Sequence, residues 1–89
     1  MGTPNYEETA RILKALAHPT RLQLIGLIRD KQPCVKMMED ILGVAQPNIS
    51  QHLSLLRNVG IVEAERDGHK VCYRIKNENV LKFIDAIME

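Results

Sequence analysis

Apolar residues recur at every third or fourth position in the first two thirds of the chain, which is the spacing of helices that bury one face. Proline and glycine divide this region. The residue before Pro19 avoids helical angles, and Gly43 and Gly60 suit the left-handed geometry at which helices end. The predicted helices cover residues 6–17, 19–29, 35–42 and 46–59.

The pattern changes to alternation after Gly60, which is typical of strands. Two predicted strands, residues 61–66 and 70–76, flank Asp67-Gly68, a strong signal for a hairpin turn. A last helix follows Asn77 and runs to about Met88. Two closely spaced helices followed by a hairpin predict one winged helix-turn-helix domain, mainly α with a β-hairpin wing, over residues 1–89.

The predicted helix over residues 46–59 separates its side chains onto two faces. Ile49, Leu53 and Leu56 fall on one side and should face the core. The other side offers amides, hydroxyls and one cation, which pair with base edges and phosphates, whereas a carboxylate would repel phosphate. No acidic residue occurs between residues 45 and 58. The candidate DNA-binding residues here are Gln46, Pro47, Asn48, Ser50, Gln51, Ser54 and Arg57.

Two further features favour a nucleic-acid partner. The helix begins after Ala45, whose side chain cannot cap the unpaired backbone N–H groups, and such helix starts attract anions. We therefore expect a DNA phosphate to complete this end. The hairpin tip carries Arg66, His69 and Lys70, which can reach the DNA backbone or the minor groove.

Bulk composition limits the function classes. The chain has 89 residues, 45% of them hydrophobic and 26% charged, which suits one small globular domain that gains from a partner. The net charge is only +1, so DNA binding must depend on local placement of charge. Neither a membrane-length apolar run nor a secretory signal is visible, so we expect a soluble, cytoplasmic protein. Motifs for catalysis are absent from the sequence, so an enzyme, catalytic residues and a cofactor are not expected.

Several ordered segments carry a resemblance to a known family. They are Ala15–Leu22, Leu42–Leu53, Asn58–Val62 and Asp67–Tyr73. With them the chain resembles the ArsR/SmtB repressors over nearly its whole length. The resemblance implies a homodimeric winged-helix repressor on an operator of two-fold symmetry. It also implies release from DNA when a metal ion, a metalloid or a thiol-reactive signal binds.

The first and last predicted helices have apolar stripes broader than one small core should require, which favours self-association. In the ArsR/SmtB family these terminal helices form the dimer interface. The alternative is that the same residues close the core of a single chain. The candidate interface residues are Leu13, Leu16, Leu81, Ile84, Ile87 and Met88.

The two cysteines are the candidate sensing thiols. The family's thiol metal site uses a Cys-Val-Cys motif, in which Cys34 matches the first cysteine and Lys36 replaces the second. The family's other site uses Asp and His pairs on the last helix, where this chain has no histidine, so no metal site is expected. Cys34 lies at a helix start beside Lys36, and both features favour the reactive thiolate. Cys72 should point away from the buried face of the second strand.

Several roles stay open. The cysteines could pack, could bind a metalloid together with thiols of a partner subunit, or could sense oxidants or electrophiles. A constitutive winged-helix regulator without sensing is one alternative function. A winged helix used for protein–protein contacts is the other, and it predicts acidic or apolar residues on the exposed face of residues 46–59.

Overall fold

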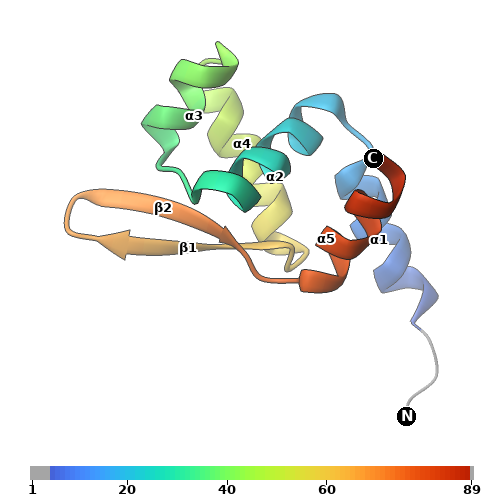
Figure 1. The fold of residues 1–89 in the computed structure, drawn as a ribbon. Helices are drawn as coiled ribbons and strands as arrows, with labels where there is room; N and C mark the ends of the chain where they lie inside the picture. Colours follow the sequence, from blue (N-terminus) through green and yellow to red (C-terminus); the bar gives the residue numbers. More distant parts are fainter. Residues whose placement is uncertain (1–4, 89) are drawn as a thin grey trace.

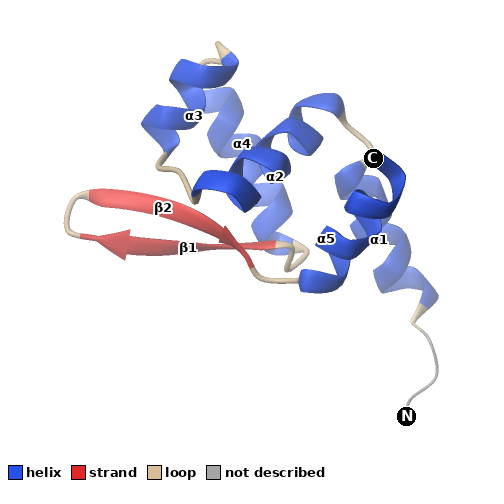
Figure 2. Cartoon of the chain, viewed as in Figure 1, coloured by secondary structure: helices blue, strands red, loops and turns tan. Residues whose placement is uncertain are grey.

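The computed structural model describes residues 5–88 and has the helix and strand order expected of a winged helix-turn-helix (Figure 1, Figure 2). Residues 1–4 and 89 lie outside the described part of the chain. The predicted fold class is confirmed, and the boundaries differ by one or two residues. The elements are α1 (Tyr6–Leu16), α2 (Pro19–Lys31), α3 (Val35–Leu42), α4 (Gln46–Asn58), β1 (Val62–Asp67), β2 (Lys70–Ile75) and α5 (Glu78–Met88).

Polar side chains cap the starts of α1, α2 and α5. Asn5 accepts a hydrogen bond from the amide of Glu8 at 2.9 Å, and Asn77 at the start of α5 accepts one from the amide of Asn79 at 3.0 Å. The cap of α2 was not predicted. There Nδ1 of His18 accepts from the amide of Thr20 at 3.1 Å, so the imidazole takes the place of the usual hydroxyl or carboxylate.

The core lies where α2, α3 and α4 meet the base of the wing. α1 contributes Ala15 and Leu16, whereas its predicted stripe through Tyr6 and Leu13 stays at the surface. One apolar face of α1 is therefore left over when the single chain has folded. The core residues with no exposed surface are Leu24, Ile25, Ile28, Met38, Ile49, Leu53, Leu56 and Ile61.

The wing is an antiparallel hairpin whose register runs from Val62 opposite Ile75 to Asp67 opposite Lys70. A third segment pairs with it. The loop before α3 forms an antiparallel bridge through residue 34 to residue 72, and the amide of Tyr73 donates to the carbonyl of residue 33 at 3.1 Å. The start of α3 is thereby attached to the edge of β2.

Candidate nucleic-acid interface

α3 and α4 form the helix-turn-helix, and buried side chains hold α4 in place. Ile49, Leu53 and Leu56 of α4 are fully buried, as predicted, and Met38 of α3 packs into the same core. The opposite face of α4 is therefore turned to solvent. All of its predicted DNA-contacting residues are exposed: Gln46, Pro47, Asn48, Ser50, Gln51, Ser54 and Arg57.

The start of α4 has no side-chain cap, because Ala45 occupies the N-cap position. The amide of Asn48 already donates to the carbonyl of Ala45 at 3.0 Å, and Pro47 has no amide hydrogen. Within residues 5–88, only the amide of Gln46 is then left free in this first turn to meet an anion. Of the first three residues of α4, only Gln46 can therefore offer a backbone N–H to the expected phosphate.

The wing tip extends the polar surface. Arg66, His69 and Lys70 are all exposed around the turn, where Gly68 has a φ of +63°. Arg74 behaves differently, because its Nε lies 2.6 Å from a carboxylate oxygen of Glu63. The charge of Arg74 is therefore balanced by a carboxylate of the wing itself. The basic residues of the wing tip, Arg66, His69 and Lys70, remain exposed to solvent.

Arg21 of α2 contacts both α1 and α4. Its Nε donates to the carbonyl of Ala15 at 2.6 Å, and its Nη1 lies 3.3 Å from Nδ1 of His52 on α4. The rings of His18 and His52 are 4.6 Å apart between centroids. Partial burial, together with the nearby His18 and Arg21, lowers the pKa of His52. A neutral imidazole can accept the hydrogen bond from Arg21, so the lowered pKa and the contact agree.

We expect the stability of the domain to fall as the pH is lowered through the ordinary imidazole pKa of 6.5, because the unfolded chain then binds a proton that folded His52 resists. His52→Gln should flatten this part of the stability curve, and His69→Gln at the exposed wing tip should not. Urea unfolding at pH values from 5 to about 8 measures both. An unchanged slope in His52→Gln would refute the assignment.

α1 and α5 lie at the end of the molecule away from the hairpin turn (Figure 1). Both helices expose apolar side chains there. Phe83 and Leu13 are each 45% exposed, Ile87 is 64% exposed and Met88 is 60% exposed. Together with neighbouring apolar residues they line a groove of about 220 Å³. An exposed apolar patch of this kind usually marks an interaction surface.

The residues predicted for the dimer interface divide into two groups. Leu13, Ile87 and Met88 belong to the exposed surface just described. Leu16 and Ile84 are each only 5% exposed and serve the core of the single chain. Leu81 is half-buried. Phe83 was not among the predicted residues, although it belongs to the same exposed surface and lies one helical turn before Ile87.

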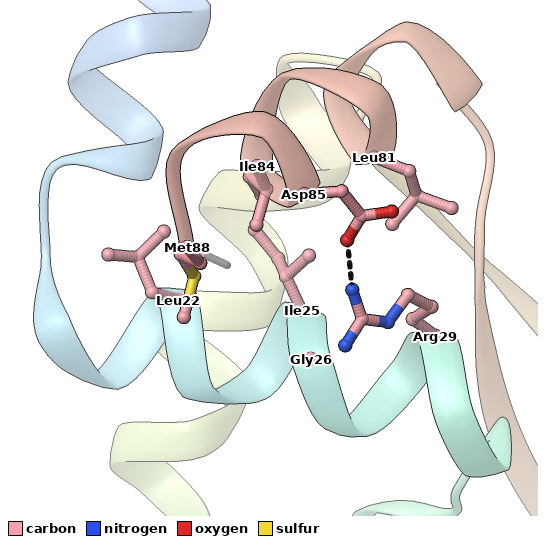
Figure 3. A pocket seen from close by; sticks show the side chains of 8 residues that line it. All are labelled: Leu22, Ile25, Gly26, Arg29, Leu81, Ile84, Asp85 and Met88. Atoms are coloured by element: carbon pink, nitrogen blue, oxygen red, sulfur yellow. Dashed lines mark hydrogen bonds and ion pairs between the residues drawn. The ribbon is translucent and has the colours of Figure 1, made fainter.

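A second groove, of about 350 Å³, runs between α2 and α5 and shares residues with the first (Figure 3). Leu22 and Met88 lie at one end of it, and an ion pair between Arg29 and Asp85 lies at the other. Its lining is mostly apolar, and the ion pair links α2 to α5 at its polar end. The groove thus continues the apolar surface of α5 toward α2.

Cys34 and Cys72 lie side by side although 38 positions separate them in the chain. Their Sγ atoms are 2.7 Å apart, and both residues are half-buried. Cys72 was expected to point away from the buried face of the strand, but the loop before α3 covers it. The ammonium group of Lys36 pairs with Asp40 and not with the thiol of Cys34, since its Nζ lies 3.3 Å from a carboxylate oxygen of Asp40.

Membrane-spanning helices and metal-binding clusters are both absent from the described part of the chain. No helix within residues 5–88 is both long and apolar enough to cross a membrane. In the same part of the chain, His, Cys, Asp and Glu side chains do not gather in threes, as a protein metal site would require.

Comparisons with known proteins agree with this geometry. The family model described as bacterial regulatory protein, arsR family, matches residues 18–64, which include α2, the helix-turn-helix and the start of the wing. The HTH-type transcriptional repressor SmtB of Mycobacterium tuberculosis is 37% identical over 82 residues. This match covers 91% of the chain and 61% of SmtB, so the chain spans less than two thirds of that relative.

Solved structures show the same arrangement. HlyU from Vibrio cholerae superposes with a TM-score of 0.87 at 28% identity, covering 97% of this chain and 94% of HlyU. The homodimeric winged helix-turn-helix DNA-binding domain Mb0332 of Mycobacterium bovis superposes with a TM-score of 0.84 at 29% identity, covering 98% and 86% of the two chains. The family match, the SmtB-like sequence and the shared fold together show that the chain belongs to the ArsR family of bacterial regulatory proteins.

Proposed function

We propose that this chain binds double-stranded operator DNA as a homodimer and represses transcription. α4 enters the major groove, and the wing tip meets the backbone or the minor groove beside it. The observation that carries the proposal is the solvent face of α4. It exposes amides, hydroxyls and one guanidinium, with no carboxylate between residues 45 and 58. This composition suits a polyanion better than it suits a protein partner.

The exposed residues divide by chemistry into two roles. Gln46, Ser50 and Gln51 read base edges, because amides and hydroxyls can pair with them in the major groove. The cations contact phosphates and set the position of the domain on the duplex. Asn48 and Ser54 flank the reading residues, and Pro47 brings the start of α4 close to the backbone. The phosphate-contacting residues are Arg57, Arg66, Lys70 and, at the wing tip, His69.

Dimerisation uses the apolar surface of α1 and α5. The exposure of Leu13, Phe83, Ile87 and Met88 supports this choice, and the Mb0332 domain, which has the same fold, is homodimeric. Two copies joined there present two α4 helices, which read half-sites about one helical turn, or 34–36 Å, apart. The protein acts in the cytoplasm, where a bacterial regulator meets chromosomal DNA.

Release of the operator depends on a small thiol-reactive inducer, for which Cys34 and Cys72 are the available groups. An oxidant needs only these two thiols. A metalloid prefers several thiolates and would need further ligands from the partner subunit. If nothing releases the DNA, the protein is a constitutive regulator.

Arg57→Ala should weaken binding to mixed-sequence duplex DNA and lower the slope of log affinity against log salt by about one for each subunit. The exposed guanidinium of Arg57 makes no ion pair within residues 5–88, so its loss should leave the fold intact. Arg11→Ala on α1 removes the same charge away from α4 and is the matched control. Binding that is absent, or independent of salt, in the unmodified protein would favour a protein-contact module.

A further inference from the structure

Cys34 and Cys72 lie close enough together to react with each other. Cys34 is the N-cap residue of α3, the first helix of the helix-turn-helix, and Cys72 lies in the middle of β2 in the wing. The two sulfur atoms are 2.7 Å apart. Two thiols from the two parts of the proposed DNA-binding surface therefore meet at one point.

Backbone pairing fixes this proximity. The bridge between Cys34 and Cys72 is antiparallel, and the hydrogen bond beside it runs from the amide of Tyr73 to the carbonyl of Pro33. The cysteines themselves thus form a pair that exchanges no hydrogen bond between their own backbones. In such pairs the Cα atoms lie about 4.5 Å apart and the side chains are closest. That separation is within the range of about 4.4–6.8 Å that disulfides span.

The local chemistry assigns different roles to the two thiols. The hydrogen bond between the two sulfur atoms is the largest cause that raises the pKa of Cys72, so this contact favours the protonated form of Cys72. Cys34 is the N-cap residue of α3 and makes no side-chain cap hydrogen bond, so its sulfur lies beside the unpaired backbone N–H groups of this helix start. Both residues are half-buried, so a small oxidant can reach them.

We propose that Cys34 and Cys72 form a redox-active dithiol that peroxide converts into an intramolecular disulfide between the helix-turn-helix and the wing. The Cys34 thiolate attacks one oxygen of hydrogen peroxide, the O–O bond breaks, and the leaving hydroxide takes a proton to become water. The sulfur of Cys72 then attacks the resulting Cys34 sulfenic acid. Its S–O bond breaks, and a second water leaves with the Cys72 proton. The two thiols lose two electrons in total, and the peroxide gains them.

The bond has a consequence for DNA binding, and this part rests on the proposed function. The disulfide holds the start of α3 and strand β2 in the geometry of the free domain. Any adjustment that fits α4 and the wing tip together onto a duplex must then strain the bridge. Operator affinity should fall about fivefold or more, within the usual range of coupling between two sites.

The test uses the full chain, first reduced and then treated with a small excess of hydrogen peroxide. Intact mass should fall by about 2 Da, corresponding to two hydrogens, and peptide mapping should join residues 34 and 72. The thermal midpoint should rise on the order of 10 °C, because the bond closes a long loop. A dithiol reductant should reverse all of these changes. Oxidation only to separate sulfenic or sulfinic acids, or only to links between chains, would overturn the proposal.

Single variants separate the two roles. Cys72→Ser should stop at a Cys34 sulfenic acid that a trapping reagent captures, whereas Cys34→Ser should react far more slowly. Both should bind DNA like the reduced wild type and lose the response to peroxide. A disulfide that forms without changing operator affinity would overturn the regulatory part. Failure of the reduced protein to bind DNA would instead contradict the proposed function and leave the mass and mapping results valid.

Discussion

Phe83→Glu is expected to convert the dimer into monomers and to lower operator affinity by about 10²–10⁴-fold. At a dimer interface the new carboxylate would be buried among apolar groups without a partner, which costs several kcal/mol. Monomers would then bind each half-site separately and would lose the gain that linkage gives. Sedimentation equilibrium at micromolar concentration measures the assembly, and titration of a selected duplex measures the affinity.

The choice of Phe83 follows from its exposure. It is 45% exposed in the single chain, so the substitution should spare the core, whereas glutamate at Ile84, which is 5% exposed, would damage the fold itself. Lys82→Glu is the matched control, because it places the same side chain on an exposed position of α5. If wild type is monomeric at micromolar concentration, or if Phe83→Glu remains dimeric, the α1–α5 interface is wrong.

Gln51→Ala is expected to cost about 1–3 kcal/mol in each half-site and to relax the sequence preference at the base pair that Gln51 reads. The side chain is exposed on α4 one residue before His52, whose contact with Arg21 fixes this part of the helix. Its amide can pair with adenine in a bidentate manner. Binding to mixed-sequence DNA should change little, because that binding comes mainly from phosphate contacts.

Asn58→Ala is the matched control for this experiment, because it removes an exposed amide at the far end of α4. Affinities for a selected duplex and for mixed-sequence DNA should be compared at one salt concentration, since the ratio between them reports specificity. Equal losses on both kinds of DNA in Gln51→Ala would show that Gln51 positions the helix and reads no base.

Local signals explain why the helix-turn-helix could be predicted from the sequence. Pro47 and Gly60 bracket α4, and the predicted turn glycine Gly43 has a φ of +66° at the end of α3. The spacing of Ile49 and Leu53 fixes which face of α4 is buried. Each of these signals acts within a few residues, so no knowledge of tertiary contacts was needed.

The remaining features depend on contacts that spacing alone does not specify. Cys34 meets Cys72 because a short loop follows the edge of β2, and alternation along β2 says nothing about what covers that edge. Helical periodicity likewise could not show which apolar residues of α1 and α5 pack in the core of the single chain and which stay on its surface. Leu16 and Ile87 both belong to apolar stripes, yet only Leu16 reaches the core of the single chain.

The bridge at Cys72 also separates a supported part of the hairpin from an unsupported tip. A two-stranded ribbon alone is only marginally stable in water, but here the third segment supports the hairpin in the middle of β2, beside the buried Tyr73. Beyond this point, from Arg66 to Lys70, the two strands pair only with each other, and no third segment supports them. Amide exchange should therefore be slow at the base and fast at the tip. A pliant tip on an anchored base can follow the local width of a groove while α4 keeps its alignment with the bases.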